Sequence, residues 1–297
     1  MLQLLKIIKF IIAHPLNQDK KLESLARFVK WQLGSRLVPG PVVFDWINGA
    51  RFLVEKGETG LTGNIYTGLH EFEEMAFLLH VLRKNELFVD VGANSGSYTI
   101  LACAGVGALG YAFEPAPRSF SRLVANVRIN NLDEKVVCLP KAVGDKSAEI
   151  YFTKDRNTMN RVAADDEALQ NVSACEMTSL DIALDGKSPA LLKIDVEGYE
   201  TKVLEGAQET LRKPSLYAVI LEQTGNANRY GFDESKISRV MSDCGFHAYL
   251  YNPTGRTLVK YANAKTASGN TLFIRDEMTI RKRLESAPQI CINQKRI

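Results

Sequence analysis

A carboxylate and several glycines meet where one apolar segment of this chain gives way to a turn. In LFVDVGANSG, Asp90 precedes Gly92, Asn94 and Gly96. Glycines permit a tight turn and let a ligand come close to backbone N–H groups. The turn lacks the Gly-Lys-Ser/Thr ending of a phosphate-binding loop and does not fit G-x-G-x-x-G. Because Asp90 would repel a pyrophosphate, the motif favours a cationic ligand such as S-adenosylmethionine over NAD.

A second acidic residue, Glu114, closes the apolar segment LGYAFEP and lies 24 residues after Asp90. An acidic side chain at about this distance from a glycine turn can accept hydrogen bonds from both hydroxyls of a ribose. The two carboxylates together therefore predict an adenosyl-binding site. The alternative for Glu114 is an ordinary solvated carboxylate at a strand end.

Two more apolar segments end in acidic residues: LLKIDVEGYE contains Asp195 and Glu197, and VILEQ contains Glu222. Methyl transfer to a hydroxyl requires an aligned nucleophile and a proton acceptor. We predict that Asp195, Glu197 and Glu222 converge as the catalytic carboxylates. The alternative is structural, because Glu197 and Glu200 would also stabilise the start of the helix that follows.

The same acids have a second interpretation as metal ligands. Asp195 and Glu222, with Gln223 or Asn226 nearby, offer the oxygen ligands that magnesium prefers, and the ion could lower the pKa of a substrate hydroxyl. Only the spacing of the acids supports magnesium. The four histidines form no spaced ligand set, and the five cysteines contain no CxxC pair, so a zinc site and a disulfide framework are poorly supported. We therefore expect a reducing, cytoplasmic compartment.

Alternating strands and helices would position these residues. The apolar pattern predicts that right-handed βαβ units build a mostly parallel sheet, with an antiparallel pair at the end of the chain. Ligands bind beyond the carboxyl ends of the strands in such sheets. The polar stretch 154–178, with Arg156, Asn157, Asn160 and Arg161, is interpreted either as a lid over the acceptor or as a surface loop. Strands are predicted over 87–92, 109–115, 136–143, 148–153, 191–198, 216–223, 246–252 and 270–275, and helices over 71–82, 97–104, 118–130, 200–212 and 235–244.

The first 41 residues differ from the rest of the chain. An apolar helix is predicted up to Ala13 and a second over 21–33, with Gly34 as its stop. The first helix is too short and too charged to cross a membrane. It either packs on its own domain or a dimer partner, or lies on an anionic membrane surface. A break at 39–41 precedes a hairpin predicted around Asn48-Gly49.

Charge is unevenly distributed along the chain. The total of 37 basic and 34 acidic residues leaves a net charge of +3, too small to indicate a nucleic-acid-binding protein. Residues 1–41 are net +5 and residues 276–297 net +2, so the part between them is net −4. We expect a basic helical extension (1–41), a hairpin-containing cap (42–65), a catalytic domain (66–275) and a basic tail (276–297).

The motifs as a set resemble the FkbM family of S-adenosylmethionine-dependent methyltransferases. The resemblance runs from about residue 66 to 275 and is carried by EFEEMAFLLHVLRKNELFVDVGANSGSYT, AFEP, LDIAL, LLKIDVEGYETKVLEGA, ILEQ and NTLFI. It implies the class I methyltransferase fold: a mostly parallel, Rossmann-like α/β sheet of seven strands, one of them antiparallel, with helices on both faces. It also implies O-methylation of a hydroxyl on a sugar, polysaccharide, glycolipid or polyketide.

The resemblance also assigns residues. Asp90, Gly92, Asn94 and Gly96 match the cofactor loop and Glu114 the ribose-binding acid, while Asp195 and Glu197 match the KIDVEG signature. Glu71 matches a recurring glutamate that could reach the amino end of the cofactor, and Asp181 matches an LD element that is structural or catalytic. The family often has a glycine where this chain has RKNE at 83–86; an asparagine tolerates the same helix-ending conformation.

The sequence thus predicts an O-methyltransferase with S-adenosylmethionine as cofactor and a glycan or small molecule as acceptor. A magnesium-dependent O-methyltransferase of a small natural product is the alternative. More remote alternatives are a nucleotide-dependent oxidoreductase and a non-catalytic scaffold that holds the cofactor. Peripheral membrane contact and a homodimer through the first helices remain open.

Overall fold

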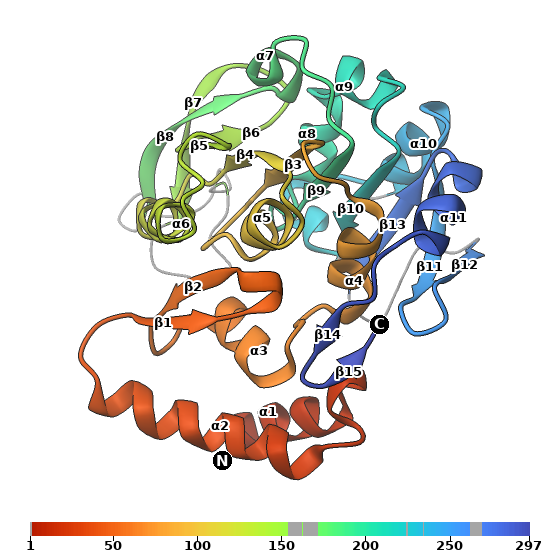
Figure 1. Cartoon of the computed structure of the whole chain (residues 1–297). Coiled ribbons are helices and arrows are strands. Elements are labelled where there is room, and N and C mark those ends of the chain that lie inside the picture. Colours follow the sequence, from red (N-terminus) through yellow and green to blue (C-terminus); the bar gives the residue numbers. More distant parts are fainter. Residues whose placement is uncertain (1, 154–161, 163–171, 224, 234, 262–268) are drawn as a thin grey trace.

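A large twisted sheet with helices on both faces forms the body of the molecule (Figure 1). The computed structural model describes the whole chain except residues 1, 154–161, 163–171, 224, 234 and 262–268. Its strand order is β12-β11-β13-β10-β9-β3-β4-β5. The bounds are β3 Leu87–Val91, β4 Leu109–Phe113, β5 Val136–Leu139, β9 Leu191–Ile194, β10 Ala218–Glu222, β11 His247–Asn252, β12 Thr257–Lys260 and β13 Asn270–Ile274.

The pairing confirms the predicted fold class. Strands β5, β4, β3, β9 and β10 run parallel, whereas β13 is antiparallel to both of its neighbours, β10 and β11. This is the expected seven-stranded arrangement with one reversed strand. An eighth strand, β12, pairs with β11 at the edge of the sheet and was not predicted.

Both faces of the sheet are buried, which explains the continuous apolar runs in its central strands. Neighbouring residues of a strand point to opposite faces, and Phe88 and Val89 accordingly belong to different apolar cores. One core includes residues of α4 (Phe72–Val81), α5 (Ser97–Ile100), the π-helical turn η3 (Leu101–Val106), α6 (Pro117–Ile129) and α11 (Glu277–Glu285). The other includes residues of α7 (Leu180–Leu184), α8 (Glu200–Glu205), α9 (Gln208–Arg212) and α10 (Ser235–Asp243).

Two predicted helices differ in their bounds. The helix predicted over 200–212 is interrupted at Gly206 and Ala207, whose backbone angles (φ −90°, ψ 10° and φ −121°, ψ 20°) are not helical. Gly206 must be a glycine, because a Cβ there would lie 2.0 Å from the Gly144 carbonyl oxygen. The second N-terminal helix, α2 (Lys21–Leu37), does not stop at Gly34 as predicted. It ends where Val38 becomes extended (φ −101°, ψ 120°), the conformation that a following proline favours.

A small sheet, β6-β8-β7, stands beside the main one, with β6 Ala142–Val143, β7 Ala148–Thr153 and β8 Val172–Thr178. The last seven residues of the stretch predicted to be a lid or a loop are therefore the strand β8, paired antiparallel with β7. Arg156, Asn157, Asn160 and Arg161 lie outside the described residues.

The N-terminal residues fold as a layer of their own beneath the sheet (Figure 1). Helix α1 (Leu2–Ala13) leads through the short turn η1 (Pro15–Asn17) to α2, and the predicted hairpin is β1 (Val42–Asp45) and β2 (Arg51–Val54), joined by η2 (Ile47–Gly49). Helix α3 (Thr59–Thr67) completes the layer. Ile11, Phe28, Phe52, Ile65 and Tyr66 are among the residues of its small apolar core. Of the described helices, none is both long and apolar enough to cross a membrane.

The last residues of the chain are also ordered elements. Ile280 and Leu284 of α11 are buried in the same apolar core as α4. Arg283 on α11 pairs with Glu86 at 2.7 Å, before β3. A final hairpin of β14 (Cys291–Ile292) and β15 (Lys295–Arg296) follows.

Candidate active site

A cavity of about 890 Å³ lies beyond the carboxyl ends of the parallel strands. Its lining contains seven acidic and four basic side chains, so its formal charge is negative. Of the residues that the sequence predicted for the site, Gly96 does not line the cavity and the following ones do: Glu71, Asp90, Gly92, Asn94, Glu114, Asp195, Glu197 and Glu222.

The glycine turn after β3 is built around a close contact within the protein. Gly92 has φ 81°, and a Cβ there would lie 1.8 Å from the Asp195 carbonyl oxygen. The N–H groups of Gly92 and Ala93 both donate to the Phe113 carbonyl oxygen, at 3.0 and 2.9 Å. Gly92 therefore lets the turn lie against the end of β9, which adds a structural role to the predicted approach of a ligand. Gly96 (φ 92°) packs against Leu123 on α6.

Asp90 and Glu114 are both buried at the floor of the cavity. Thr99 Oγ1 donates to Asp90 Oδ2 at 2.5 Å, and the backbone N–H groups of Asn94 and Ala116 donate to the two Glu114 oxygens at 2.8 Å each. Burial raises the pKa of Asp90 to about 6 and that of Glu114 to about 7, although these hydrogen bonds act in the opposite direction. Glu114 thus holds the glycine turn as well as facing the cavity.

Lys193 is the residue of the site that the sequence did not reveal. Its side chain is 1% exposed, and its ammonium group lies 3.1 Å from Asp195 Oδ2 and 3.0 Å from Asn270 Oδ1. Burial by itself would lower the pKa of Lys193, yet the carboxylates of Asp195, Glu71 and Glu222 raise it above its ordinary value. A lysine within the apolar run LLKID is the one sequence signal for this buried cation.

Glu71 belongs to the same network from the start of α4. Its carboxylate accepts hydrogen bonds from Tyr98 Oη at 2.5 Å and from Asn270 Nδ2 at 2.9 Å. Burial, followed by the nearby Glu71 carboxylate, raises the pKa of Tyr98 well above its ordinary value. Glu71 therefore joins three distant segments at the wall of the cavity, and this adds a positioning role to the predicted contact with the cofactor.

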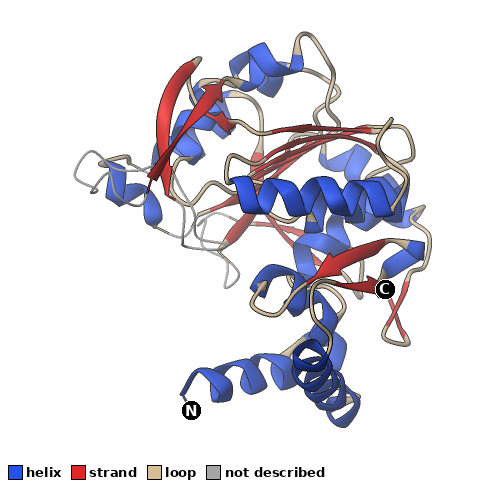
Figure 2. Cartoon of the chain, turned by 90° about the vertical axis from the view of Figure 1, so that its left-hand side faces the viewer, coloured by secondary structure: helices blue, strands red, loops and turns tan. Residues whose placement is uncertain are grey.

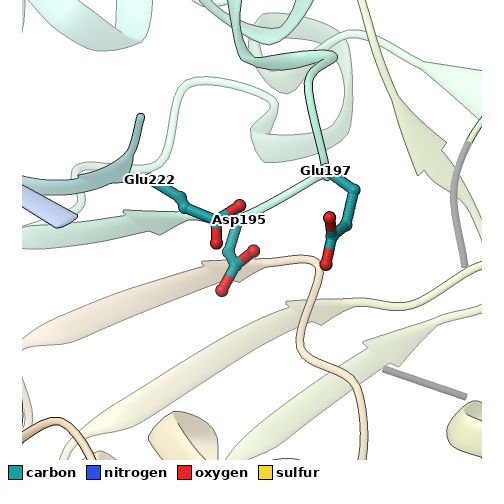
Figure 3. A group of neighbouring side chains, drawn as sticks. All are labelled: Asp195, Glu197 and Glu222. Atoms are coloured by element: carbon teal, nitrogen blue, oxygen red, sulfur yellow. The ribbon is translucent and has the colours of Figure 1, made fainter. Parts of the chain in front are cut away.

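Three carboxylates converge at the ends of β9 and β10 (Figure 3). Asp195, Glu197 and Glu222 each offer an oxygen, and these oxygens all lie within 4.8 Å of one another. One buried oxygen of Glu222, Oε2, has no hydrogen-bond partner among the described residues. Burial and then the Asp195 carboxylate raise the pKa of Glu222, so Glu222 retains its proton at higher pH than an ordinary glutamate.

The turn that carries Glu197 is strained and held in place. Glu197 has φ 56°, a left-handed conformation that is uncommon outside glycine and often marks functional sites. The buried Glu200 carboxylate accepts the N–H groups of Val196 and Gly198, both at 3.1 Å, and Asn226 Nδ2 donates to Glu197 Oε2 at 3.1 Å. Glu200 is therefore structural, and Asn226 holds one of the three carboxylates.

Two other residues have structural roles. Asp181 accepts three hydrogen bonds from Glu209 and Thr210 at the start of α9, at 2.7 to 2.9 Å, which agrees with the structural alternative for the LD element. The Gln223 amide oxygen accepts the Thr271 hydroxyl at 2.8 Å, and Gln223 does not line the cavity.

The N-terminal layer contributes the roof of the cavity. Lys56, Gly57 and Glu58 line it from the segment between β2 and α3, and Gly60 and Leu61 line it from the first turn of α3. Arg122 on α6 holds this segment, because its guanidinium lies 2.9 Å from both Glu55 and Glu58. The cavity is thus enclosed by two parts of the chain that lie far apart in the sequence.

Comparison with known proteins identifies the family. Residues 90–248 match the methyltransferase FkbM domain. The chain is 24% identical over 229 residues to the hexuronic acid methyltransferase AglP of Haloferax volcanii, which covers 75% of this chain and 89% of that protein.

Two solved structures show a distant likeness. Methyltransferase FkbM from Methylobacillus flagellatus is 13% identical, with a TM-score of 0.44 over 72% of this chain and 52% of that one, so the match spans about half of its length. Precorrin-6y C5,15-methyltransferase from Geobacter metallireducens is 13% identical, with a TM-score of 0.39 over 69% and 87% of the two chains.

The match to the FkbM domain extends over more than half of the chain and includes both the glycine turn and the carboxylates at the ends of β9 and β10. The chain therefore belongs to the FkbM family and is an S-adenosylmethionine-dependent methyltransferase.

Proposed function

We propose that this methyltransferase O-methylates a hydroxyl of a sugar, in a polysaccharide or glycolipid. The convergence of Asp195, Glu197 and Glu222 within 4.8 Å carries the proposal. A cluster of acids favours a neutral hydroxyl as acceptor and repels a carboxylate. The hexuronic acid methyltransferase of Haloferax volcanii, similar over 75% of the chain, supports a sugar as the acceptor class. A hexuronic acid carries a carboxylate as well as hydroxyls, so the preference for a hydroxyl is supported by the acid cluster alone.

The cavity fits S-adenosylmethionine in the chemistry of its lining. We assign Asp90 and Glu114 to the cofactor's nucleoside part and Glu71 to its amino end, with the turn at Gly92 and Asn94 beside them. Seven carboxyls suit a ligand with an ammonium and a sulfonium group. The bound cofactor supplies a methyl group that is electrophilic because it is attached to a sulfonium.

The three acids have two different roles toward the acceptor. The Asp195 carboxylate is paired with the Lys193 ammonium at 3.1 Å, and Glu197 is oriented by Asn226. We assign the proton-accepting role to these two, because a hydroxyl must lose its proton as its oxygen forms the new bond to carbon. Glu222, which keeps its proton more strongly, donates a hydrogen bond to an acceptor oxygen.

The assignment is tested on the glycans and glycolipids of cells that lack the protein and are supplied with variants. Wild type should increase the mass of one glycan by one CH₂ unit per methyl group, and Asp195→Asn and Glu197→Gln should abolish the increase. Glu222→Gln should retain most of it, because an amide resembles the protonated carboxyl. A methyl group lost in mild alkali would be an ester and would contradict methylation of a hydroxyl; no change in any glycan would contradict a sugar acceptor.

Magnesium dependence is a second candidate, favoured by the three carboxylate oxygens. Their donor type fits the ion, but the Lys193 ammonium already supplies a positive charge at 3.1 Å from Asp195. We therefore favour metal-independent transfer. Activity that survives EDTA would support this choice, and activity lost in EDTA and restored by Mg²⁺ would support the metal.

A further inference from the structure

Exposed apolar side chains are concentrated in the N-terminal layer. Among the described residues, nine of the sixteen large apolar side chains that are exposed lie between positions 4 and 43, so this short part of the chain carries most of them. Exposed apolar side chains that form a contiguous patch mark a binding surface or a membrane contact. The nine are Leu4, Leu5, Phe10, Leu22, Val29, Leu33, Leu37, Val38 and Val43.

The exposed apolar side chains of helix α2 form one stripe along the helix. Leu22, Val29, Leu33 and Leu37 are spaced by seven, four and four residues, which places them within about 80° of one another around the helix. Leu22 is 84% exposed and Leu37 is 83% exposed. The opposite side of α2, with the buried Phe28, packs into the core of the N-terminal layer. The stripe therefore faces outward along the whole helix.

Helix α1 extends this surface in a second direction. Figure 2 shows α1 projecting from the body of the molecule, with its N-terminal end farthest away. Leu4 is 48% and Leu5 58% exposed near that end, whereas Ile11 near its other end is fully buried. The C-terminal end of α1 is thus packed against the protein, whereas its N-terminal end is exposed.

Basic side chains flank the apolar ones. Residues 1–41 contain seven basic and two acidic side chains, and five of the basic ones are exposed: Lys6, Lys9, Lys21, Lys30 and Arg36. Both acids already lie beside a lysine, Asp19 at 3.4 Å from Lys295 and Glu23 at 3.4 Å from Lys20. The surface around the stripe is accordingly positive.

We propose that this face, which comprises the outer sides of α1 and α2, docks the enzyme on the surface of an anionic phospholipid bilayer. Exposed leucines flanked by lysines are the combination that inserts into the headgroup region of such a bilayer, with the ammonium groups on the lipid phosphates. The proposal does not depend on the identity of the methyl acceptor.

The positive charge of this face argues against a second copy of the chain as the partner that covers it. A two-fold interface would place this face against itself, and each copy would bring the same five exposed basic side chains. Like charges at an interface oppose association. An anionic lipid surface satisfies both the apolar stripe and the positive charge.

Docking would also bring the active site to the membrane. Helix α3 shares an apolar core with α1 and α2, and Gly60 and Leu61 at its start line the active-site cavity. The layer that would lie on the bilayer is therefore the one that covers the cavity.

The experiment is co-sedimentation of the full chain with vesicles. We expect binding to vesicles containing about one third phosphatidylglycerol, weak binding to pure phosphatidylcholine, and loss of binding as salt rises from about 0.1 to about 0.5 M. The double variant Leu33→Glu/Leu37→Glu should lower the bound fraction by at least about tenfold. The matched control is Ile182→Glu on α7, an equally apolar side chain that is 62% exposed far from this face, and it should bind as wild type does.

Binding of S-adenosylhomocysteine should be the same in all three proteins, which shows that the variants are folded. The proposal is overturned if wild type does not bind the anionic vesicles or if Leu33→Glu/Leu37→Glu binds them equally well. It is also overturned if light scattering finds wild type to be a dimer that this double variant converts to a monomer, because a second copy would then cover the face.

Discussion

At the scale of single residues, two buried carboxyls connect cofactor binding to pH. Asp90 has its pKa raised to about 6 and Glu114 to about 7, in both cases mainly by burial. Without ligand, each group binds its proton more tightly in the folded protein than in the unfolded chain. The stability that they contribute is therefore present at low pH and is lost as pH rises from about 4 through 6 to 7.

A bound nucleoside reverses this dependence, because its hydroxyl and N–H groups donate hydrogen bonds that favour the ionised carboxylates. We expect S-adenosylhomocysteine to raise the Tm more at pH 8 than at pH 5.5, as measured by thermal unfolding at both values. Asp90→Asn and Glu114→Gln should each weaken its binding by about 10- to 100-fold and flatten the pH dependence. Asp243→Asn, at an exposed position on α10, is the control. An equal Tm increase at both pH values would contradict the assignment.

A second prediction at this scale concerns the buried cation Lys193. Replacing it by methionine leaves Asp195 and Glu71 without their buried cation, which should lower the free energy of unfolding by about 3–5 kcal/mol at pH 7. Urea unfolding at pH 7 measures the loss. Lys187→Met, at an exposed position, should change stability by less than about 0.5 kcal/mol; an equally small loss for Lys193→Met would contradict this account.

At the scale of elements, the site depends on how closely the turn after β3 approaches the end of β9. Gly92 and Gly186 offer a matched pair, since they have φ 81° and 76°. A Cβ at Gly92 would lie 1.8 Å from the Asp195 carbonyl oxygen, whereas a Cβ at Gly186 would meet nothing within 4 Å. The two positions share the conformational cost of a side chain and differ in the clash.

Gly186→Ala should therefore cost about 1–2 kcal/mol, the cost of the left-handed conformation alone. Gly92→Ala should cost more, because the turn and β9 must separate, and it should also weaken the binding of S-adenosylhomocysteine. Chemical unfolding and calorimetry measure the two effects. Equal losses of stability in the two variants would show that the close contact with Asp195 is not what requires a glycine.

At the scale of the whole molecule, the N-terminal layer and the catalytic sheet enclose the cavity jointly. Arg122 connects them through Glu55 and Glu58 at 2.9 Å each, with 14% of its side chain exposed. Arg128 lies on the same helix, and its contact with Asp133 is longer, at 3.7 Å, and far more exposed. The first pair holds the roof and the second lies on the surface.

Arg122→Met should weaken S-adenosylhomocysteine binding by about tenfold and speed amide hydrogen exchange in residues 55–61, because the roof loses its anchor. Arg128→Met should leave both measurements unchanged, as expected for an exposed ion pair. Unchanged exchange in Arg122→Met would mean that the layer is held by its apolar contacts instead.

The sequence by itself determined the order of the elements and the strand ends that carry the site. Apolar runs bounded by turns predict strands, and parallel strands place their carboxyl ends at one edge, so Asp90, Glu114 and Asp195 could be assigned to one cavity without coordinates. It also determined the break before the hairpin and the charge of the first 41 residues. These are local properties, encoded by neighbouring residues.

Only the tertiary structure decided which distant groups meet. Lys193 donates a hydrogen bond to Asn270, which is 77 residues away in the sequence, and Gly92 packs against the Asp195 backbone. The outer face of α2 could be told from its inner face only after the core of the N-terminal layer was formed. Such contacts depend on strand order and packing, which the local pattern of a sequence does not encode. For the same reason, the acids at the strand ends were predictable as a set, whereas the lysine that holds one of them was not.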